Sequence, residues 1–403
     1  MFQRGYPTPD PTNPFVLPTP LRTGASAGYT GRGIVIAFID SGFYPHPDLG
    51  NRVLAHVDAT TSRIVEGRRY GRPMWYSWHG QMTSVVACGD GSISDGRYAG
   101  IASEANLVLV KVSTIHKQIK EPDILRGLQW VLENHNRFNI RIVNLSVGGD
   151  TPNNDAEYAL YTIIRELASA GVTIVTAGGN SPSLPLVPPN CAPEAITIGG
   201  FDDHNSLNTA DWTLYTNTFG LAFDGTPKPD VLAPANWIAS PILPGTYVMR
   251  EARWLAQLLN LPANDVAKLR TLLKLGIHDF RESFKVTREQ LDQADLTNVL
   301  EAVQARILEH KIIDQYHQYV SGTSVAAAVA SSIIAQMLEA NPRLTPLNIK
   351  AILMQTAKRL PNAPLEQQGA GIIDASEAVA ASVAFPSRAA AAIDFSNLVN
   401  TED

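Results

Sequence analysis

Three residues in this sequence have side chains suited to nucleophilic catalysis: Asp40, His79 and Ser324. A serine hydroxyl is a weak nucleophile at neutral pH, so Ser324 needs a base within hydrogen-bonding reach, and histidine has a pKa near the working pH. A carboxylate behind that histidine would fix its tautomer and stabilise its charged form. Taken singly, each has an ordinary structural explanation: a turn for Asp40, a cap or surface position for His79, and a helix cap for Ser324.

The elements that must position these residues follow from the apolar pattern. Short, continuous β-branched runs occupy residues 34–39, 107–112, 140–145, 172–177 and 195–198. Unbroken apolar strands are typical of a parallel sheet covered on both faces. Helical patterns around residues 124–132 and 156–167 separate these runs. We therefore predict an α/β fold with three layers and a mainly parallel central sheet.

The three candidate residues lie where such a sheet places its sites, at strand ends and helix starts. Asp40 ends the first run and is followed by the segment 46–49, His-Pro-Asp-Leu. His79-Gly80 opens an apolar helix, and Gly322-Thr323-Ser324-Val325-Ala326 opens a helix of small residues. In this chain order the motifs resemble those of the subtilisin-like serine proteases, the subtilases.

Further segments extend the resemblance over residues 28–243 and 319–380. The family relationship implies an oxyanion hole formed by the Asn180 side chain and the backbone N–H of Ser324. It also implies that an extended substrate pairs with a backbone edge. The substrate-binding residues implied in this way are Ser146, Val147, Gly148, Ala177, Gly178 and Gly179. The three glycines would leave room for the substrate side chain before the scissile bond.

Three positions depart from the family pattern. Gln81 stands where the family usually has Thr, Val325 where Met usually follows the nucleophile, and Ala328 where a helix Pro is usual. None of these departures removes a proton-transfer group or an oxyanion donor. We therefore expect a catalytically competent site.

The predicted domain organisation is a catalytic domain over residues 21–385 with additions. Residues 1–20 carry six prolines and are expected to form an extended arm outside the core, with an inhibitory role in cis as one hypothesis. Residues 245–317 form an insertion with three helical stripes and a capping-box sequence at 287–290. This insertion is expected to be surface decoration, a lid or a docking element for a partner. Residues 386–403 form a tail.

Composition limits the possible partners and compartment. With 32 basic and 38 acidic residues, the net charge of −6 disfavours nucleic-acid binding. No membrane span or secretory signal is predicted, which favours the cytoplasm unless a leader was removed. Cys88 is expected to be structural rather than catalytic, and whether Cys191 pairs with it is left open. No metal or other cofactor is predicted to be required, although oxygen ligands between Asp90 and Asp95 leave calcium possible.

Two classes of function remain open from the sequence. The first is a serine endopeptidase that hydrolyses proteins or peptides through Asp40, His79 and Ser324 and an acyl-enzyme intermediate. The second is a subtilase-fold binding or regulatory protein with vestigial proteolysis. A fluorophosphonate label separates them, because it reacts only with an activated serine.

Overall fold

Strand β1 (Val35–Asp40) lies near the centre of a nine-stranded sheet. The structure is a computed structural model, and it describes residues 2–10, 12–67, 73–116, 118–149, 151–262, 265–275 and 297–386. The strand order is β11-β7-β6-β5-β1-β4-β2-β3, with β8 paired to β7. The other strands are β2 (Val53–Asp58), β3 (Val65–Gly67), β4 (Asn106–Lys111), β5 (Ile140–Leu145), β6 (Thr173–Ala177), β7 (Ile196–Asp202), β8 (Thr213–Leu214) and β11 (Val231–Pro234). Within this sheet, the β2–β3 and β7–β8 pairs are antiparallel and the other pairs are parallel.

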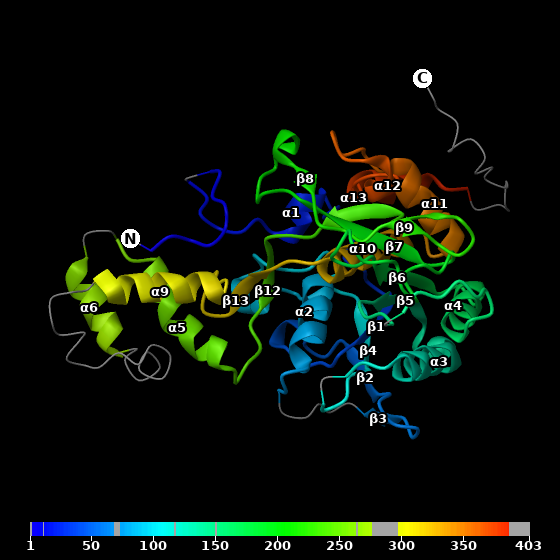
Figure 1. The fold of residues 1–403 in the computed structure, drawn as a ribbon, viewed down its shortest axis with the longest axis horizontal. Coiled ribbons are helices and arrows are strands. Elements are labelled where there is room, and N and C mark those ends of the chain that lie inside the picture. The colour runs from blue at the N-terminus through cyan, green and yellow to red at the C-terminus, as the bar shows by residue number, and fades with distance from the viewer. Residues whose placement is uncertain are drawn as a thin grey trace.

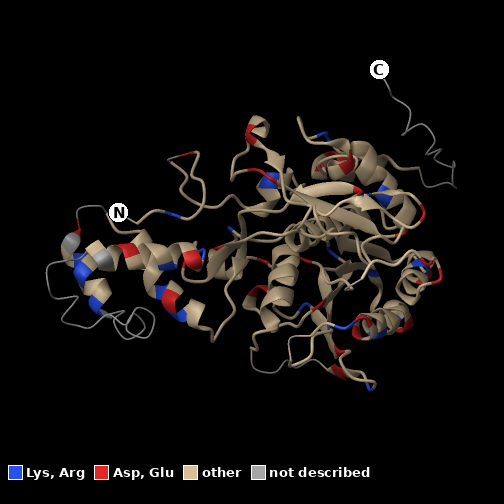
Figure 2. Cartoon of the chain, in the orientation of Figure 1, with Lys and Arg blue, Asp and Glu red and all other residues tan. Residues whose placement is uncertain are grey.

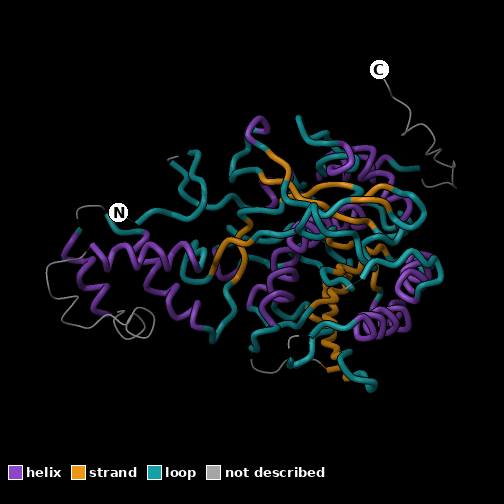
Figure 3. Tube along the Cα trace, in the orientation of Figure 1, coloured by secondary structure: helices purple, strands orange, loops and turns teal. Residues whose placement is uncertain are grey.

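Helices cover both faces of this sheet (Figures 1 and 3). Successive β1 side chains point to opposite faces, so Ile36 and Phe38 enter one core whereas Ala37 and Ile39 enter the other. The first core contains α2 (Ser77–Cys88), α10 (Thr323–Ala340), α11 (Pro346–Thr356) and α13 (Ala375–Ala384). The second contains α3 (Glu121–Phe138) and α4 (Ala159–Ser169). The predicted three-layer α/β fold with a mainly parallel sheet is confirmed.

Helix α10 is the central helix of the first core. Its length of 18 residues and its apolar composition would allow it to cross a membrane, but 83% of that stretch is buried within the fold. It packs against α2, α13 and strands β5, β6, β7 and β11. Small side chains such as Ala326 and Ala330, both fully buried, permit this close approach.

The insertion interrupts a two-stranded antiparallel ladder formed by β12 (Ile238–Pro241) and β13 (His317–Val320). Beyond the ladder, α5 (Tyr247–Leu259), α6 (Val266–Leu275) and α9 (Thr297–Glu309) stand to one side of the sheet (Figure 1). The predicted capping box at 287–290 lies outside the described residues. Acidic and basic residues both occur on α5 and α9, so neither helix has a surface of a single charge (Figure 2).

The three described insertion helices share a hydrophobic cluster of their own. It includes Leu255, Leu273, Val303 and Ile307, and it is separate from the two cores that cover the sheet. At its centre the carboxylate of Glu251 is fully buried and pairs with Arg306 and His310. Because removing one partner of a buried ion pair is costly, this contact fixes α5 against α9.

The prolines of the N-terminal arm led us to expect it outside the core, but part of it is buried. Tyr6 and Val16 are buried in a cluster with Tyr319 of β13. The Tyr319 hydroxyl donates a hydrogen bond of 3.0 Å to the Gly5 carbonyl, and Gln3 exchanges hydrogen bonds with Gln304 of α9. The prolines indicate an extended chain. They do not indicate that Tyr6 and Val16 are buried in a hydrophobic cluster.

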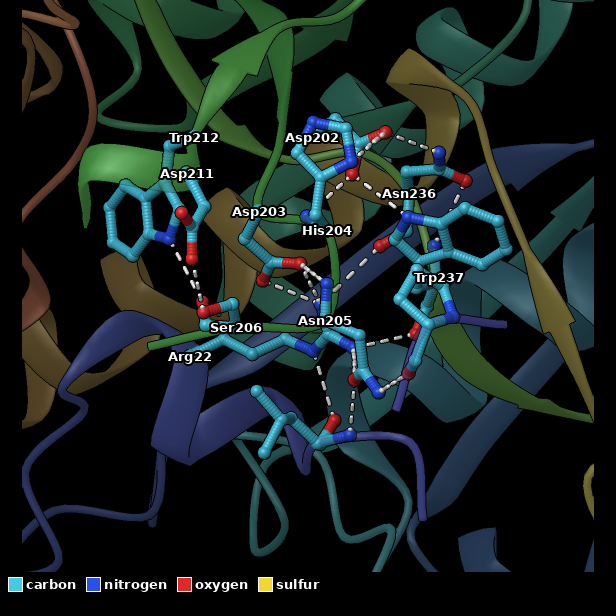
Figure 4. A network of polar contacts seen from close by, with 12 residues as sticks. Arg22, Asp202, Asp203, His204, Asn205, Ser206, Asp211, Trp212, Asn236 and Trp237 are labelled. Carbon is cyan, nitrogen blue, oxygen red and sulfur yellow. Dashed lines mark hydrogen bonds and ion pairs between the residues drawn. The ribbon is translucent and has the colours of Figure 1, made fainter. Parts of the chain in front are cut away.

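Arg22 anchors the arm to the catalytic core at α1 (Thr19–Thr23). Its guanidinium is fully buried, pairs with Asp203 at 2.5 Å and donates to the Trp237 carbonyl at 2.7 Å (Figure 4). Asn205 in the same network accepts from the Leu17 backbone N–H at 2.8 Å. None of the hydrogen bonds made by the described arm residues reaches Asp40, His79 or Ser324. The contacts of the arm are with the insertion, β13 and the core, and its inhibitory role stays a hypothesis.

The rest of the described chain completes the edges of the fold. It comprises β9 (Gly220–Leu221), β10 (Pro227–Lys228), α12 (Leu365–Gln368) and the 3-10 turns Pro47–Leu49, Ser92–Ser94 and Thr209–Asp211. The predicted tail falls outside the described residues except for residue 386.

Candidate active site

Asp40 is the last residue of β1, and His79 of α2 meets it there. The Asp40 carboxylate is fully buried, and its Oδ1 lies 2.7 Å from His79 Nδ1. The same oxygen accepts the Ser41 backbone N–H at 2.6 Å. These contacts direct the second imidazole nitrogen away from the carboxylate, which is the orientation that a general base requires.

Thr83 holds the other oxygen of this carboxylate. Its hydroxyl donates to Asp40 Oδ2 at 2.9 Å from one turn after His79 on α2. Residues four apart share one face of a helix, so both side chains can reach the same carboxylate. The sequence alone does not single out Thr83, because its contact with Asp40 forms only when α2 packs beside β1.

Two glycines allow α2 to approach β1 closely enough for the contact. A Cβ atom at Gly80 would lie 2.2 Å from the Gly42 carbonyl oxygen, and one at Gly42 would lie 2.5 Å from the Tyr76 ring. Both distances are far below van der Waals contact. A side chain at either position would therefore push His79 away from Asp40.

The surroundings of His79 set its proton affinity. Burial lowers the pKa of His79, but the Asp40 charge and the hydrogen bond to it have the opposite effect and together raise that pKa above its ordinary value. The neutral form, which is the base, is thus populated at higher pH than in a free histidine. The imidazole is still 30% exposed, so a substrate can reach it.

Ser324 is the second residue of α10 and follows Gly322, whose φ of +139° favours glycine. Helices α2 and α10 pack together, which brings the start of α10 to the His79 side of the sheet. Among the described residues, no hydrogen bond joins His79 to Ser324. In proteins without substrate such a bond is often long and shortens on binding.

Asn180 lies directly beside the start of α10. Its Oδ1 accepts the Thr323 backbone N–H at 2.8 Å and the Thr323 hydroxyl at 3.1 Å. The carbonyl end of the amide is thereby occupied, which leaves Nδ2 as the donor. A Cβ at Gly322 would lie 3.8 Å from this nitrogen and 3.9 Å from the Ser324 backbone nitrogen, so two donors flank one space. Sequence reasoning did not predict the Thr323 contact, because it depends on tertiary structure.

The predicted substrate edge lies at the end of β5. The Ser146 hydroxyl contacts the Ser324 carbonyl at 3.4 Å. Val147 and Gly148 are half-buried and make no backbone hydrogen bond to another described residue. Their backbone groups are consequently available for pairing with an added strand.

The glycines at the end of β6 lie close to later segments of the chain. Ala177 ends the strand, a Cβ at Gly178 would lie 3.1 Å from the Ile198 carbonyl oxygen, and one at Gly179 would lie 2.5 Å from the Thr218 hydroxyl. At Gly148 a Cβ would be in ordinary contact with Val187, at 3.4 Å. These contacts explain why glycine is needed at positions 178 and 179. The room for a substrate side chain that the family resemblance implies stays a prediction.

The three departures from the family pattern are accommodated in the core. Gln81 is fully buried, and its amide donates to the Pro241 carbonyl of β12 at 3.4 Å. Val325 and Ala328 are fully buried in α10. These substitutions therefore act through packing around the site.

Both cysteines are free and buried. Burial raises the pKa of the Cys88 thiol to about 12, and Cys191 lies 2.8 Å from the Tyr161 hydroxyl. A thiol with so high a pKa is a poor nucleophile. This agrees with a structural role for Cys88.

The described residues contain no group of three or more His, Cys, Asp or Glu side chains placed to hold a metal ion. In the candidate calcium loop, the Asp90 carboxylate accepts the Ser92 backbone N–H at 2.9 Å. Of the insertion histidines, His310 pairs with Glu251 and His317 with Asp314, whereas His278 lies outside the described residues.

Comparison with known proteins gives a consistent picture. The model of the subtilase family matches residues 31–371. The serine protease AprX of Bacillus subtilis is 28% identical over 359 residues, covering 87% of this chain and 67% of AprX. Subtilisin E of the same species is 29% identical over 231 residues, covering 55% of this chain and 52% of that relative. The chain thus spans between half and two thirds of the length of these curated relatives.

Solved structures share the fold. Fervidolysin of Fervidobacterium pennivorans, described as a keratinolytic enzyme related to subtilisin, has a TM-score of 0.58 at 17% identity and covers 89% of this chain and 45% of its own. A protease of Pseudoalteromonas arctica has a TM-score of 0.57 at 19% identity and covers 91% of this chain and 94% of its own.

Proposed function

The chain belongs to the subtilase family of serine proteases, and from that premise we propose that it is an endopeptidase that cleaves peptide bonds through an acyl-enzyme formed on Ser324. The observation that carries the proposal is the pairing of His79 with a buried Asp40 at 2.7 Å, on a helix that packs against α10. Proteins or peptides are the substrate class.

Acylation would begin with attack of Ser324 Oγ on the carbonyl carbon of the scissile bond. His79 Nε2 takes the hydroxyl proton as the new C–O bond forms, and Asp40 stabilises the resulting imidazolium. The carbonyl oxygen becomes negatively charged and receives hydrogen bonds from Asn180 Nδ2 and the Ser324 backbone N–H. When the C–N bond breaks, His79 returns its proton to the leaving amine.

Deacylation would repeat these steps with water as the nucleophile. His79 takes a proton from the water, the hydroxyl attacks the ester carbon, and Ser324 leaves with the proton that His79 returns. Each group ends in its starting state. No metal ion enters these steps.

The extended substrate would be held by the backbone of Val147 and Gly148 on the side that becomes the acyl group. That assignment is supported by the unpaired backbone of this edge and by its contact with Ser324. Action in the cytoplasm remains a prediction, consistent with two cysteines that form no disulfide.

A fluorophosphonate probe tests the proposal. The full chain should be labelled at Ser324, and labelling should be lost in Ser324→Ala and strongly reduced in His79→Ala. Ser169→Ala, an exposed serine at the end of α4, is the matched control and should still react. Absence of labelling in a folded wild-type protein would instead favour a binding protein that has lost proteolysis.

A further inference from the structure

A cavity of about 470 Å³ lies where the insertion meets the catalytic core. Its walls come from the segment before His79, from the start of α5, from the end of α9 and from β13. Figure 1 shows these elements on the side of α2 that faces away from β5 and β6. The volume is within the range of pockets that bind organic groups, roughly 300–1,000 Å³.

The walls of this cavity are mainly apolar. They include Trp75, Trp78, Ile242, Leu243, Val248 and Val320. Trp75 is 43% exposed, an unusual exposure for so large an aromatic side chain, whereas Ile242 and Leu243 are buried. An exposed aromatic residue that lines an apolar cavity is typical of a surface that binds a partner.

The charged residues of the cavity already have partners. Glu309 pairs with Arg306 at 2.6 Å, and His310 pairs with Glu251. The ammonium group of Lys311 lies 5.7 Å from the centre of the Tyr319 ring. Binding a further charge would disturb these pairs, so the cavity favours an uncharged apolar group.

The cavity adjoins the proton carrier of the reaction. The Trp78 ring centroid is 6.0 Å from that of His79, and Ser321, three residues before the nucleophile, also lines the cavity. In the reaction His79 protonates the leaving amine, so the leaving half of the substrate departs on the imidazole side. The acyl half lies along Val147 and Gly148, beyond the start of α10.

We propose that this cavity binds an apolar side chain, aromatic or branched aliphatic, at the first or second position after the scissile bond. This proposal rests on the proposed endopeptidase function, and it specifies which substrates the endopeptidase prefers. Trp75 and Val248, one from the core and one from the insertion, are the specificity-determining residues. The insertion thereby contributes directly to substrate recognition.

The test uses the full chain and internally quenched peptides that share one acyl half and carry Phe, Leu, Gly or Asp at the two positions after the scissile bond. An oligopeptide methyl ester with the same acyl half serves as a reference, because methanol is too small to occupy the cavity. We expect kcat/KM for Phe or Leu to exceed that for Asp about tenfold or more, as for burial of one apolar side chain.

Two variants examine the cavity walls. Trp75→Ala should reduce the preference for Phe over Asp by roughly tenfold, and Val248→Lys should shift it toward Asp. Both should hydrolyse the methyl ester at the wild-type rate, which shows that they fold. Leu347→Ala, an exposed change on α11 away from the cavity, is the matched control and should keep the wild-type preference.

The outcomes separate the two proposals. Equal cleavage of all peptides by the wild type, or a preference that neither variant changes, overturns the cavity assignment while ester hydrolysis upholds the endopeptidase. Failure of the wild type to hydrolyse the ester overturns the proposed function, and the cavity assignment with it.

Discussion

At the scale of single residues, the site depends on side chains that support the three reacting groups. Asp40, His79 and Ser324 could be predicted from sequence because each stands in a short local motif. Thr83 and Thr323 could not be assigned roles in the same way, because their hydrogen bonds to Asp40 and Asn180 exist only after the elements pack. The close neighbours of Gly178 and Gly179 could not be predicted for the same reason, since Ile198 and Thr218 lie in later segments.

Removing the nucleophile or an oxyanion donor should have different effects on turnover. Ser324→Ala should abolish peptide hydrolysis and leave the fold intact. Asn180→Ala should lower kcat on the order of 10²–10³ with little change in KM, the magnitude established in subtilisin itself for loss of one such donor. Steady-state kinetics on a peptide and a thermal melt measure both effects. Undiminished hydrolysis by Ser324→Ala contradicts the assignment.

The pH dependence should follow the raised pKa of His79. The neutral imidazole is the base, so kcat/KM should rise with pH along a limb centred above about 6.5, the ordinary value for histidine. In Asp40→Asn the two contributions that raise the pKa of His79 are lost and burial remains, so the limb should move to lower pH. The pH dependence of kcat/KM, measured from pH 4 to 9 for the wild type and for the residual activity of Asp40→Asn, checks the direction of this shift. NMR titration of His79 in Ser324→Ala measures the pKa itself. A limb at the same pH in both proteins argues against the role of Asp40.

At the scale of elements, the strength of the local pattern decided what could be predicted. The strands β1, β4, β5 and β6, which are buried at nearly every position, have continuous apolar runs, and the stripes of α5, α6 and α9 have a helical period. Strand β2 was missed because it is half-buried and carries His56 and Asp58, which interrupt the apolar run. The β12–β13 ladder was not visible because 75 residues separate its two strands.

Replacing the insertion tests whether it also restricts access to the site. The Ile242 backbone N–H donates to the Tyr316 carbonyl at 2.8 Å, so a short Gly/Ser linker in place of residues 246–313 can join the ends. We expect methyl ester hydrolysis to persist and cleavage of a folded protein to increase several-fold, since the insertion no longer excludes large substrates. A Gly/Ser extension of the β9–β10 turn at Asp224 controls for added flexibility. Loss of ester hydrolysis without unfolding would show that the insertion organises Ser324 instead.

At the scale of the whole molecule, the arm links parts that otherwise have separate hydrophobic clusters. Its buried Tyr6 packs against Tyr319 at a ring-centroid distance of 5.8 Å, Phe2 packs on the insertion cluster, and Arg22 fixes the far end in the core. The proline content predicted an extended conformation. The partners of the arm could not be predicted, because they come from segments about 200 to 300 residues away.

Deleting residues 2–14 should therefore destabilise the insertion rather than activate the enzyme. Loss of the buried Tyr6 side chain alone removes about 1.5–3 kcal/mol of apolar burial, and the backbone amides of α9 should exchange hydrogen faster. Methyl ester hydrolysis should stay at the wild-type rate. Hydrogen-exchange mass spectrometry and ester kinetics measure both, and Gln3→Ala at the exposed end of the arm is a mild control. A clear gain in ester hydrolysis would support the inhibitor hypothesis.

The position of α10 in the chain has a consequence for biosynthesis. The strands that it covers, from β5 to β11, all precede it, so the ribosome completes them at least 89 residues before it begins the helix. Until then one face of the sheet, including Ile36, Phe38 and Val175, has α2 beside it but lacks α10, α11 and α13. Nascent chains of this length present apolar surface that chaperones bind and that promotes aggregation. Messages truncated between β11 and α10 should therefore yield insoluble fragments, and folding of the catalytic core must await the synthesis of α10.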